Sequence, residues 1–99
     1  MSAKGYLFVQ VNVTDPVAFE AYKTLAHAAI TQYGGRYLVR GGETALLEGE
    51  GEVPRMTIVE FDSFEQVKLA YASPEYQAAK TVRANAADMR MIALAGLEN

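Results

Sequence analysis

Apolar and polar residues alternate in the first patterned segment of the chain, residues 6–13. One face carries Leu7, Val9, Val11 and Val13, and the other carries Tyr6, Phe8, Gln10 and Asn12. This period of two predicts a β-strand that is partly apolar on both faces.

A helical pattern follows this strand. Asp15 suits the N-cap position and Pro16 suits the first helical position. Apolar residues then recur with helical spacing at Phe19, Tyr22, Ala26, Ala29, Ile30 and Tyr33. The pattern predicts a helix that packs this stripe inward and ends at the glycine pair Gly34–Gly35, where the left-handed conformation is available.

Two further strands are expected over residues 36–48 and 55–61, with a returning loop between them. The pair Gly41–Gly42 interrupts the first of these strands and suits a bulge or a sharp bend. Ser63 then opens a second helix, with Gln66 three residues later completing a capping box.

The second helix is expected to bend and restart at Ser73–Pro74, which repeats the combination of a cap and a proline. Its inner face carries Phe64, Val67 and Tyr71 before the break and Tyr76, Ala79 and Arg83 after it. Residues 87–95 are predicted to form the last strand.

This order of elements predicts an α+β fold, a ferredoxin-like βαββαβ protomer with a four-stranded antiparallel sheet and the helices on one face. The other sheet face stays open in a monomer. It would carry Tyr6 and Phe8, and also Met56 and Ile58 if the third strand is phased that way. Because such apolar patches usually mark partner surfaces, we expect a homodimer joined through the open sheet face.

Composition narrows the class of protein. The 99 residues, 51% of them apolar, contain no linker or repeat and predict one domain over residues 1–99. A net charge of −3 argues against nucleic acid as a partner, because phosphate binding needs a basic surface. No segment approaches the roughly 20 apolar residues of a membrane span. The absence of cysteine excludes disulfides and thiol chemistry, and we expect a cytoplasmic protein.

Three segments resemble the signature of domain-of-unknown-function family 1330: residues 33–42 (YGGRYLVRGG), 58–64 (IVEFDSF) and 71–76 (YASPEY). The resemblance runs from the first strand to the last. It implies membership of the dimeric α/β-barrel superfamily, in which two ferredoxin-like protomers enclose a barrel. That superfamily includes cofactor-free monooxygenases, lactone isomerases, haem-using peroxidases, chlorite-degrading enzymes and stress-induced proteins. The chain departs from the family pattern in its acidic loop over residues 49–53 and in having no tryptophan.

Arg83 is the first candidate for a functional residue, because helical spacing places its charge on the face turned toward the sheet. In one interpretation the guanidinium lines a cavity and holds a carboxylate or enolate. In the other, its stem packs against Tyr76 and its head reaches a carbonyl, an acid or the helix end.

Arg40 and Glu60 form a second candidate set, because both interrupt apolar segments of neighbouring strands. One interpretation is a buried ion pair that fixes the dimer register. The other is an acid–base carboxylate at Glu60, with a pKa raised by desolvation. Gln10 and Asn12 project to the side of Phe8 and either satisfy this charge or point at a ligand.

His27 is the only histidine, and its angular position places it on a helix flank. It is therefore a weak candidate for a catalytic base. One histidine without cysteine argues against a zinc or copper site. A haem held by this histidine alone is an open alternative, but a 99-residue protomer offers little room for it, so we expect no metal and no cofactor.

Four tyrosines lie on inward helical faces: Tyr22, Tyr33, Tyr71 and Tyr76. They pack in the core, wall a pocket between helices and sheet, or do both. We therefore expect a protein that binds a small, partly apolar carboxylic or enolic compound between helices and sheet. Two alternatives remain open: a cofactor-free monooxygenase- or isomerase-like enzyme using this pocket, and a non-catalytic structural or stress-related dimer. The feature that separates them is whether Arg83 faces a cavity or pairs with an intramolecular acid.

Overall fold

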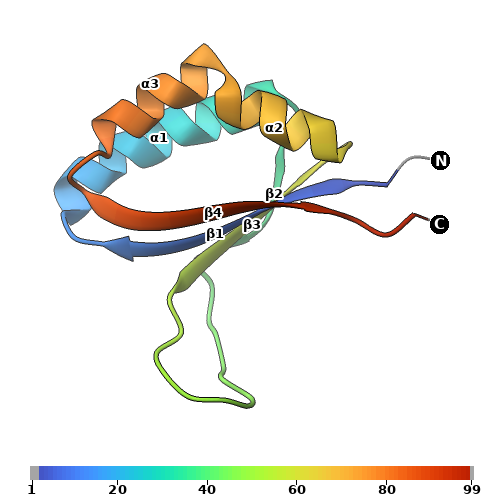
Figure 1. Ribbon diagram of the computed structural model, residues 1–99. Coiled ribbons are helices and arrows are strands. Elements are labelled where there is room, and N and C mark those ends of the chain that lie inside the picture. Colours follow the sequence, from blue (N-terminus) through green and yellow to red (C-terminus); the bar gives the residue numbers. More distant parts are fainter. Residues whose placement is uncertain (1–2, 99) are drawn as a thin grey trace.

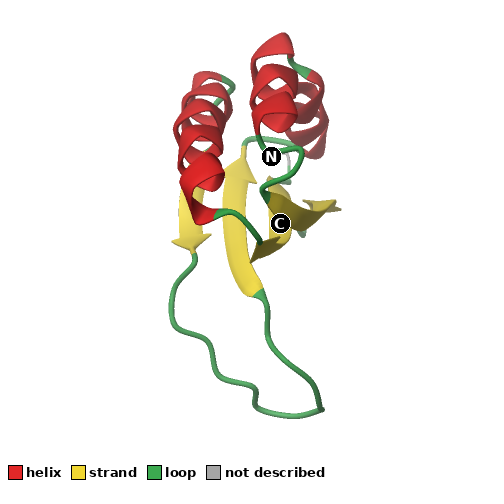
Figure 2. Ribbon diagram, turned by 90° about the vertical axis from the view of Figure 1, so that its left-hand side faces the viewer, coloured by secondary structure: helices red, strands yellow, loops and turns green. Residues whose placement is uncertain are grey.

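The computed structural model describes residues 3–98 and confirms the predicted βαββαβ order, with the second helix in two pieces. The elements are β1 Gly5–Val13, α1 Pro16–Gln32, β2 Arg36–Arg40, β3 Arg55–Phe61, α2 Phe64–Ala72, α3 Pro74–Val82 and β4 Ala87–Ala95. The antiparallel sheet has the strand order β2-β3-β1-β4. All three helices cover one face of it (Figure 1 and Figure 2).

The core lies between this sheet and the helices. Leu7, Val9 and Val11 point into it from β1 and are each at most 5% exposed, as their alternation predicts. Val59 and Phe61 of β3 are fully buried beside them. Within residues 3–98, no helix combines the length and apolar character needed to cross a membrane.

Side-chain caps set the helix bounds where the sequence predicts them. The carboxylate of Asp15 accepts a hydrogen bond from the Ala18 N–H at 3.2 Å, and Pro16 occupies the first turn of α1. Beyond the end of α1, Gly34 has a φ of +90°, the left-handed conformation that favours glycine.

The junction between α2 and α3 depends on Ser73. Its hydroxyl donates to the Ala70 carbonyl at 2.7 Å and accepts from the Tyr76 N–H at 3.1 Å, so one side chain serves both helix ends. At the start of α2, Ser63 accepts from the Gln66 N–H at 3.1 Å. The Gln66 side chain, however, donates to the Tyr33 carbonyl, so only half of the predicted capping box forms.

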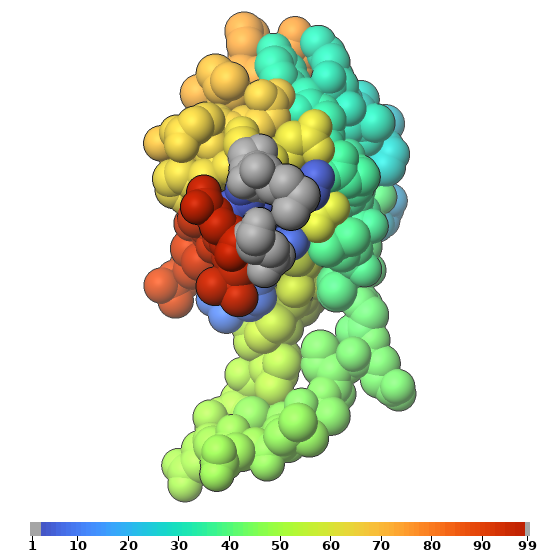
Figure 3. All heavy atoms as spheres, turned by 90° about the vertical axis from the view of Figure 1, so that its right-hand side faces the viewer, coloured from blue at the N-terminus to red at the C-terminus, as the bar shows by residue number. Residues whose placement is uncertain are grey.

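The predicted strand over residues 36–48 is too long, because β2 ends at Arg40. The Gly41 N–H makes a last bond to the Met56 carbonyl at 2.8 Å, and residues 41–54 then leave the sheet. The two glycines offer no side chains for a strand pair, and the four glutamates that follow favour solvent. The irregularity in β2 lies between Tyr37 and Val39 rather than at the glycines. Residues 41–54, called the arm below, project on the side of the sheet opposite the helices (Figure 1) and stand clear of the body (Figure 3).

The sheet face opposite the helices is uncovered, as predicted. Phe8 lies opposite Ile58 of β3 and Ile92 of β4. The register also places Met56 on this face, which confirms the expected phase of the third strand. The open-face patch comprises Tyr6, Phe8, Met56, Ile58, Ile92 and Leu94.

The glycine pairs provide a test of the packing. A Cβ on Gly35 would lie 2.5 Å from the Ile30 methyl and 2.9 Å from both Val59 and Phe61, all of which are buried. We expect Gly35→Ala to lower the free energy of unfolding by about 1–3 kcal/mol through overpacking. Gly42→Ala is the matched control, because a Cβ there meets nothing within 4 Å. Urea unfolding of both variants checks this, and equal stabilities would contradict it.

Candidate functional site

A hollow of about 430 Å³ lies between the helices α2 and α3 and the helix-facing side of β1 and β4. Its floor is apolar and consists of Leu7, Met89, Met91 and Ala93. The three β4 residues alternate along the strand, and Ala93 pairs with Leu7, so all four share one face. This floor offers an apolar body of a ligand a place to bind.

The rim of the hollow is cationic. Lys68 comes from α2, Lys80 from α3, and Arg83 from the C-cap of α3. No acidic side chain lines the hollow within the described part of the chain. Lys68 forms a salt bridge with Glu65 at 3.0 Å. Lys80 and Arg83, by contrast, have no carboxylate within 4.0 Å among residues 3–98. Two unneutralised cations therefore border one hollow.

Arg83 occupies the inward position that helical spacing predicts. Its guanidinium carbon lies 5.4 Å from the centre of the Tyr22 ring, a cation–π distance. Its Nε is buried and has no hydrogen-bond partner among residues 3–98. Burial opposes the charge, but the phenolic oxygens of Tyr76 and Tyr22 outweigh it and raise the pKa of Arg83. The guanidinium thus keeps its charge and is not paired with an intramolecular acid.

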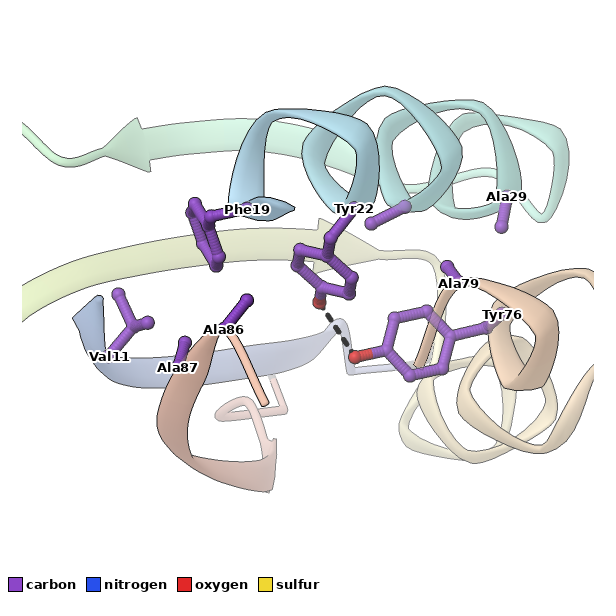
Figure 4. Close-up of a cluster of buried hydrophobic side chains, with 9 residues drawn as sticks. Val11, Phe19, Tyr22, Ala29, Tyr76, Ala79, Ala86 and Ala87 are labelled. Atoms are coloured by element: carbon purple, nitrogen blue, oxygen red, sulfur yellow. Dashed lines mark hydrogen bonds between the residues drawn. The ribbon is translucent and has the colours of Figure 1, made fainter. Parts of the chain in front are cut away.

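Tyr22 and Tyr76 lie behind Arg83 in the core rather than on the wall of the hollow. Their hydroxyls point at each other across the α1–α3 contact (Figure 4), 2.8 Å apart. Because the Tyr76 hydroxyl donates to the Met91 sulfur at 3.2 Å, the Tyr22 hydroxyl donates to the Tyr76 oxygen. The two tyrosines therefore connect both helices to the floor strand and position Arg83.

Tyr71 is the predicted tyrosine that does line the hollow. Its phenolic oxygen accepts a hydrogen bond from the Lys80 ammonium at 2.8 Å. This hydrogen bond holds the pKa of Tyr71 below its usual value. Gln77 donates to the Tyr71 backbone carbonyl at 2.8 Å and so satisfies an acceptor left at the end of α2.

Arg40 and His27 lie elsewhere, in a separate surface hollow with Glu20, Lys23 and Thr24. The Arg40 guanidinium sits 4.7 Å from the centre of the Tyr37 ring and lies 3.2 Å from His27 Nδ1. Since a guanidinium can only donate, Nδ1 is the acceptor. The His27 ring stacks on Tyr37 at 5.2 Å and is exposed, as its flank position predicts.

The predicted pairing of Arg40 with Glu60 is wrong. In the pairing of β2 with β3, Arg40 lies opposite Thr57, whereas Glu60 lies opposite Arg36. This register places Arg40 and Glu60 on opposite faces of the sheet. Glu60 is bound by Arg36 at 3.1 Å and accepts from the Tyr6 hydroxyl at 3.1 Å, both on the open face. The Glu60 carboxylate therefore points away from the hollow.

Gln10 and Asn12 also lie on the open face, away from Arg83. Gln10 is opposite Met56 and Arg90, and Asn12 borders a hollow at the base of the arm. Neither side chain lines the hollow between the helices and the sheet.

Sequence reasoning missed Lys80, which contributes the second unpaired charge of the hollow. The signal was present, because Lys80 follows Tyr76 by four residues and precedes Arg83 by three. Both spacings place it on the same helix face. Within residues 3–98, no three histidine or carboxylate side chains gather as a metal site.

The fold and the hollow together define a small ferredoxin-like α+β domain, with a hollow of cationic rim between the helices α2 and α3 and the sheet. A family model described as domain of unknown function (DUF1330) matches residues 4–97, so the chain belongs to that family. No curated protein matches the chain in sequence.

Solved structures support the fold. A protein of unknown function from Rhodopseudomonas palustris has a TM-score of 0.76 at 20% identity, with 100% of this chain and 86% of that chain covered. SnoaB, a cofactor-independent oxygenase from Streptomyces nogalater, has a TM-score of 0.69 at 15% identity, with 99% and 97% covered. A dimeric protein of unknown function and ferredoxin-like fold from Bacteroides fragilis has a TM-score of 0.61 at 17% identity, with 93% and 95% covered.

The buried tyrosine pair predicts an alkaline limit to stability. Burial holds the pKa of Tyr22 well above the 10.0 of an exposed tyrosine. Above pH 10 the unfolded chain loses this proton while the folded chain keeps it, so stability falls by up to about 1.4 kcal/mol per pH unit. We expect Tyr22→Phe to make this fall less steep in urea unfolding between pH 9 and pH 11. An unchanged pH dependence would contradict the assignment.

Proposed function

We propose that the protein binds a small, partly apolar carboxylic or enolic compound in the hollow between α2, α3 and the sheet. The observation that carries this proposal is the state of Arg83. Its charge borders the hollow, and no carboxylate among residues 3–98 neutralises it. An anionic ligand would supply the carboxylate partner that this guanidinium lacks, in a partly buried position where the attraction between opposite charges is stronger than in open water.

The shape and chemistry of the hollow agree with such a ligand. Its volume of about 430 Å³ falls in the range of small-molecule sites. The apolar floor accommodates a hydrocarbon or aromatic body, while Lys80 and Arg83 favour a negative group at the rim. The planar guanidinium suits the two oxygens of a carboxylate.

A cofactor-free enzyme that uses the same hollow is the second candidate function. The structural similarity to SnoaB favours it, because that protein is a cofactor-independent oxygenase. The two proteins are alike in fold, and one fold hosts many functions. Binding is therefore the primary proposal.

We further propose that two copies of the chain associate through the open sheet face. The open-face patch is apolar and contiguous across three strands. The Bacteroides fragilis neighbour is dimeric. The arm projects on this side of the sheet (Figure 1), where it would reach alongside a second copy.

A thermal-shift screen of small aromatic and aliphatic carboxylates tests the binding site. A ligand at a hundred times its Kd should add about 2.7 kcal/mol of stability, which raises the Tm by several degrees. We expect Arg83→Ala to lose this shift. Arg40→Ala is the matched control, because it removes the same charge from a different hollow, and it should keep the shift. No shift in the parent, or an equal shift in Arg83→Ala, would contradict the proposal.

Light scattering at micromolar concentration tests the dimer. We expect the parent to have twice the mass of the 10.8 kDa chain and Phe8→Glu to be monomeric, because the new charge would be buried between two sheets. Val17→Glu places the same charge on α1, where Val17 is 84% exposed, and should remain dimeric. A monomeric parent would overturn the proposal.

A further inference from the structure

We propose that Tyr71 and Lys80 form an acid–base pair that moves a proton between the Tyr71 oxygen and a carbon atom of an enolisable acid in the hollow. This inference rests on the proposed function, because Arg83 must hold the acid. It adds a class of reaction, proton transfer at a carbon next to a carbonyl. It also narrows the ligand to acids that carry such a carbon.

The geometry of the pair carries the inference. The Lys80 ammonium donates to the Tyr71 oxygen at 2.8 Å, and both side chains line the hollow. Lys80 has no carboxylate within 4.0 Å among residues 3–98 that would neutralise it. The positive charge of Lys80 therefore lies beside the phenolic oxygen of Tyr71 without a competing carboxylate, and it stabilises the phenolate form of Tyr71.

The surroundings of Tyr71 favour the same ionised form. The charged and titratable groups around it are Lys68 on its own helix and Lys80, Arg83 and Tyr76 on α3. The sheet contributes Leu7, Met89, Met91 and Ala93, which carry no charge. The pKa of Tyr71 is lowered, first by the Lys80 hydrogen bond and against the opposing effect of burial.

The proposed proton transfer from carbon to the Tyr71 oxygen changes no oxidation state and therefore needs no oxidant. The phenolate takes a proton from the carbon, and the electron pair of the broken C–H bond moves into an enolate. Arg83 and Lys80 stabilise the negative oxygen of that enolate. The Tyr71 hydroxyl then exchanges its proton with solvent and returns a solvent-derived proton to carbon, which gives exchange, or it donates its proton to the enolate oxygen, which gives tautomerisation.

A purely structural role for the pair makes a different prediction. In that case the hydrogen bond joins α2 to α3 and its loss changes stability alone. Proton-transfer rates and their pH dependence would not respond to Tyr71→Phe. Lys80→Arg keeps a charge beside the phenol and should retain activity, whereas Lys80→Met should not.

The first test is the ionisation of Tyr71, followed by tyrosinate absorbance of the parent minus that of Tyr71→Phe. We expect ionisation below the usual pH 10.0 in the parent and at a higher pH in Lys80→Met. Ionisation at or above the usual value in the parent, or no change in Lys80→Met, would overturn the inference.

The second test uses phenylpyruvate, an enolisable acid with an apolar ring, in D₂O. We expect the parent to accelerate exchange of the C3 hydrogens, with a rate that rises with pH up to the ionisation of Tyr71. Tyr71→Phe should lower this rate by about 100-fold or more while phenylpyruvate still binds by calorimetry. Tyr33→Phe is the matched control, because the Tyr33 hydroxyl bonds Glu75 outside the hollow.

The results with phenylpyruvate distinguish a failure of the acid–base pair from a failure of the anion site at Arg83. Binding without accelerated exchange, or equal exchange in Tyr71→Phe, would overturn the acid–base pair and leave the anion site intact. If phenylpyruvate does not bind the folded parent, the anion site itself is contradicted, and the acid–base pair loses its substrate with it.

Discussion

The hydroxyl of Ser73 holds the bend on which the candidate site depends. It ends α2 at the Ala70 carbonyl and starts α3 at the Tyr76 N–H, while Pro74 cannot continue the first helix. The bend turns the chain so that Tyr71 before it and Lys80 after it meet at one hydrogen bond. A straight helix would place residues nine positions apart about 13 Å from each other along its axis. The break in the helix therefore brings together two residues that line the hollow, Tyr71 and Lys80.

The distribution of charged side chains is the second feature on which the candidate site depends. The described chain is acidic overall, yet the hollow is bordered by cations and by no acid. The acids are elsewhere: Glu60 and Asp62 bind Arg36, and the arm carries four glutamates. This separation leaves Arg83 with tyrosines rather than carboxylates as its neighbours, and against the opposing effect of burial their phenolic oxygens raise the pKa of Arg83. An anion entering the hollow would meet attraction without a competing carboxylate.

The local rules of sequence predicted most of the fold, because each helix start carries its own cap and β1 carries a clean alternation. They failed in β2, where pairing ends at Arg40 because the glycine pair offers no side chains for a strand pair and the glutamates that follow favour solvent. The inward position of Arg83 followed from helical spacing. The partner of Glu60 did not, because the register of β2 against β3 is a tertiary property. Lys80 was within reach of the same helical count that found Arg83.

The central claim is that the Arg83 guanidinium receives an anion in the hollow. A crystal structure of the protein with 4-bromobenzoate tests it most directly, since anomalous scattering from bromine locates the ligand independently. We predict the carboxylate within hydrogen-bonding distance of the Arg83 guanidinium and the ring against Met89 and Met91. A ligand bound at the Arg40 hollow instead, or an Arg83 guanidinium engaged by a carboxylate of the protein itself, would contradict the claim.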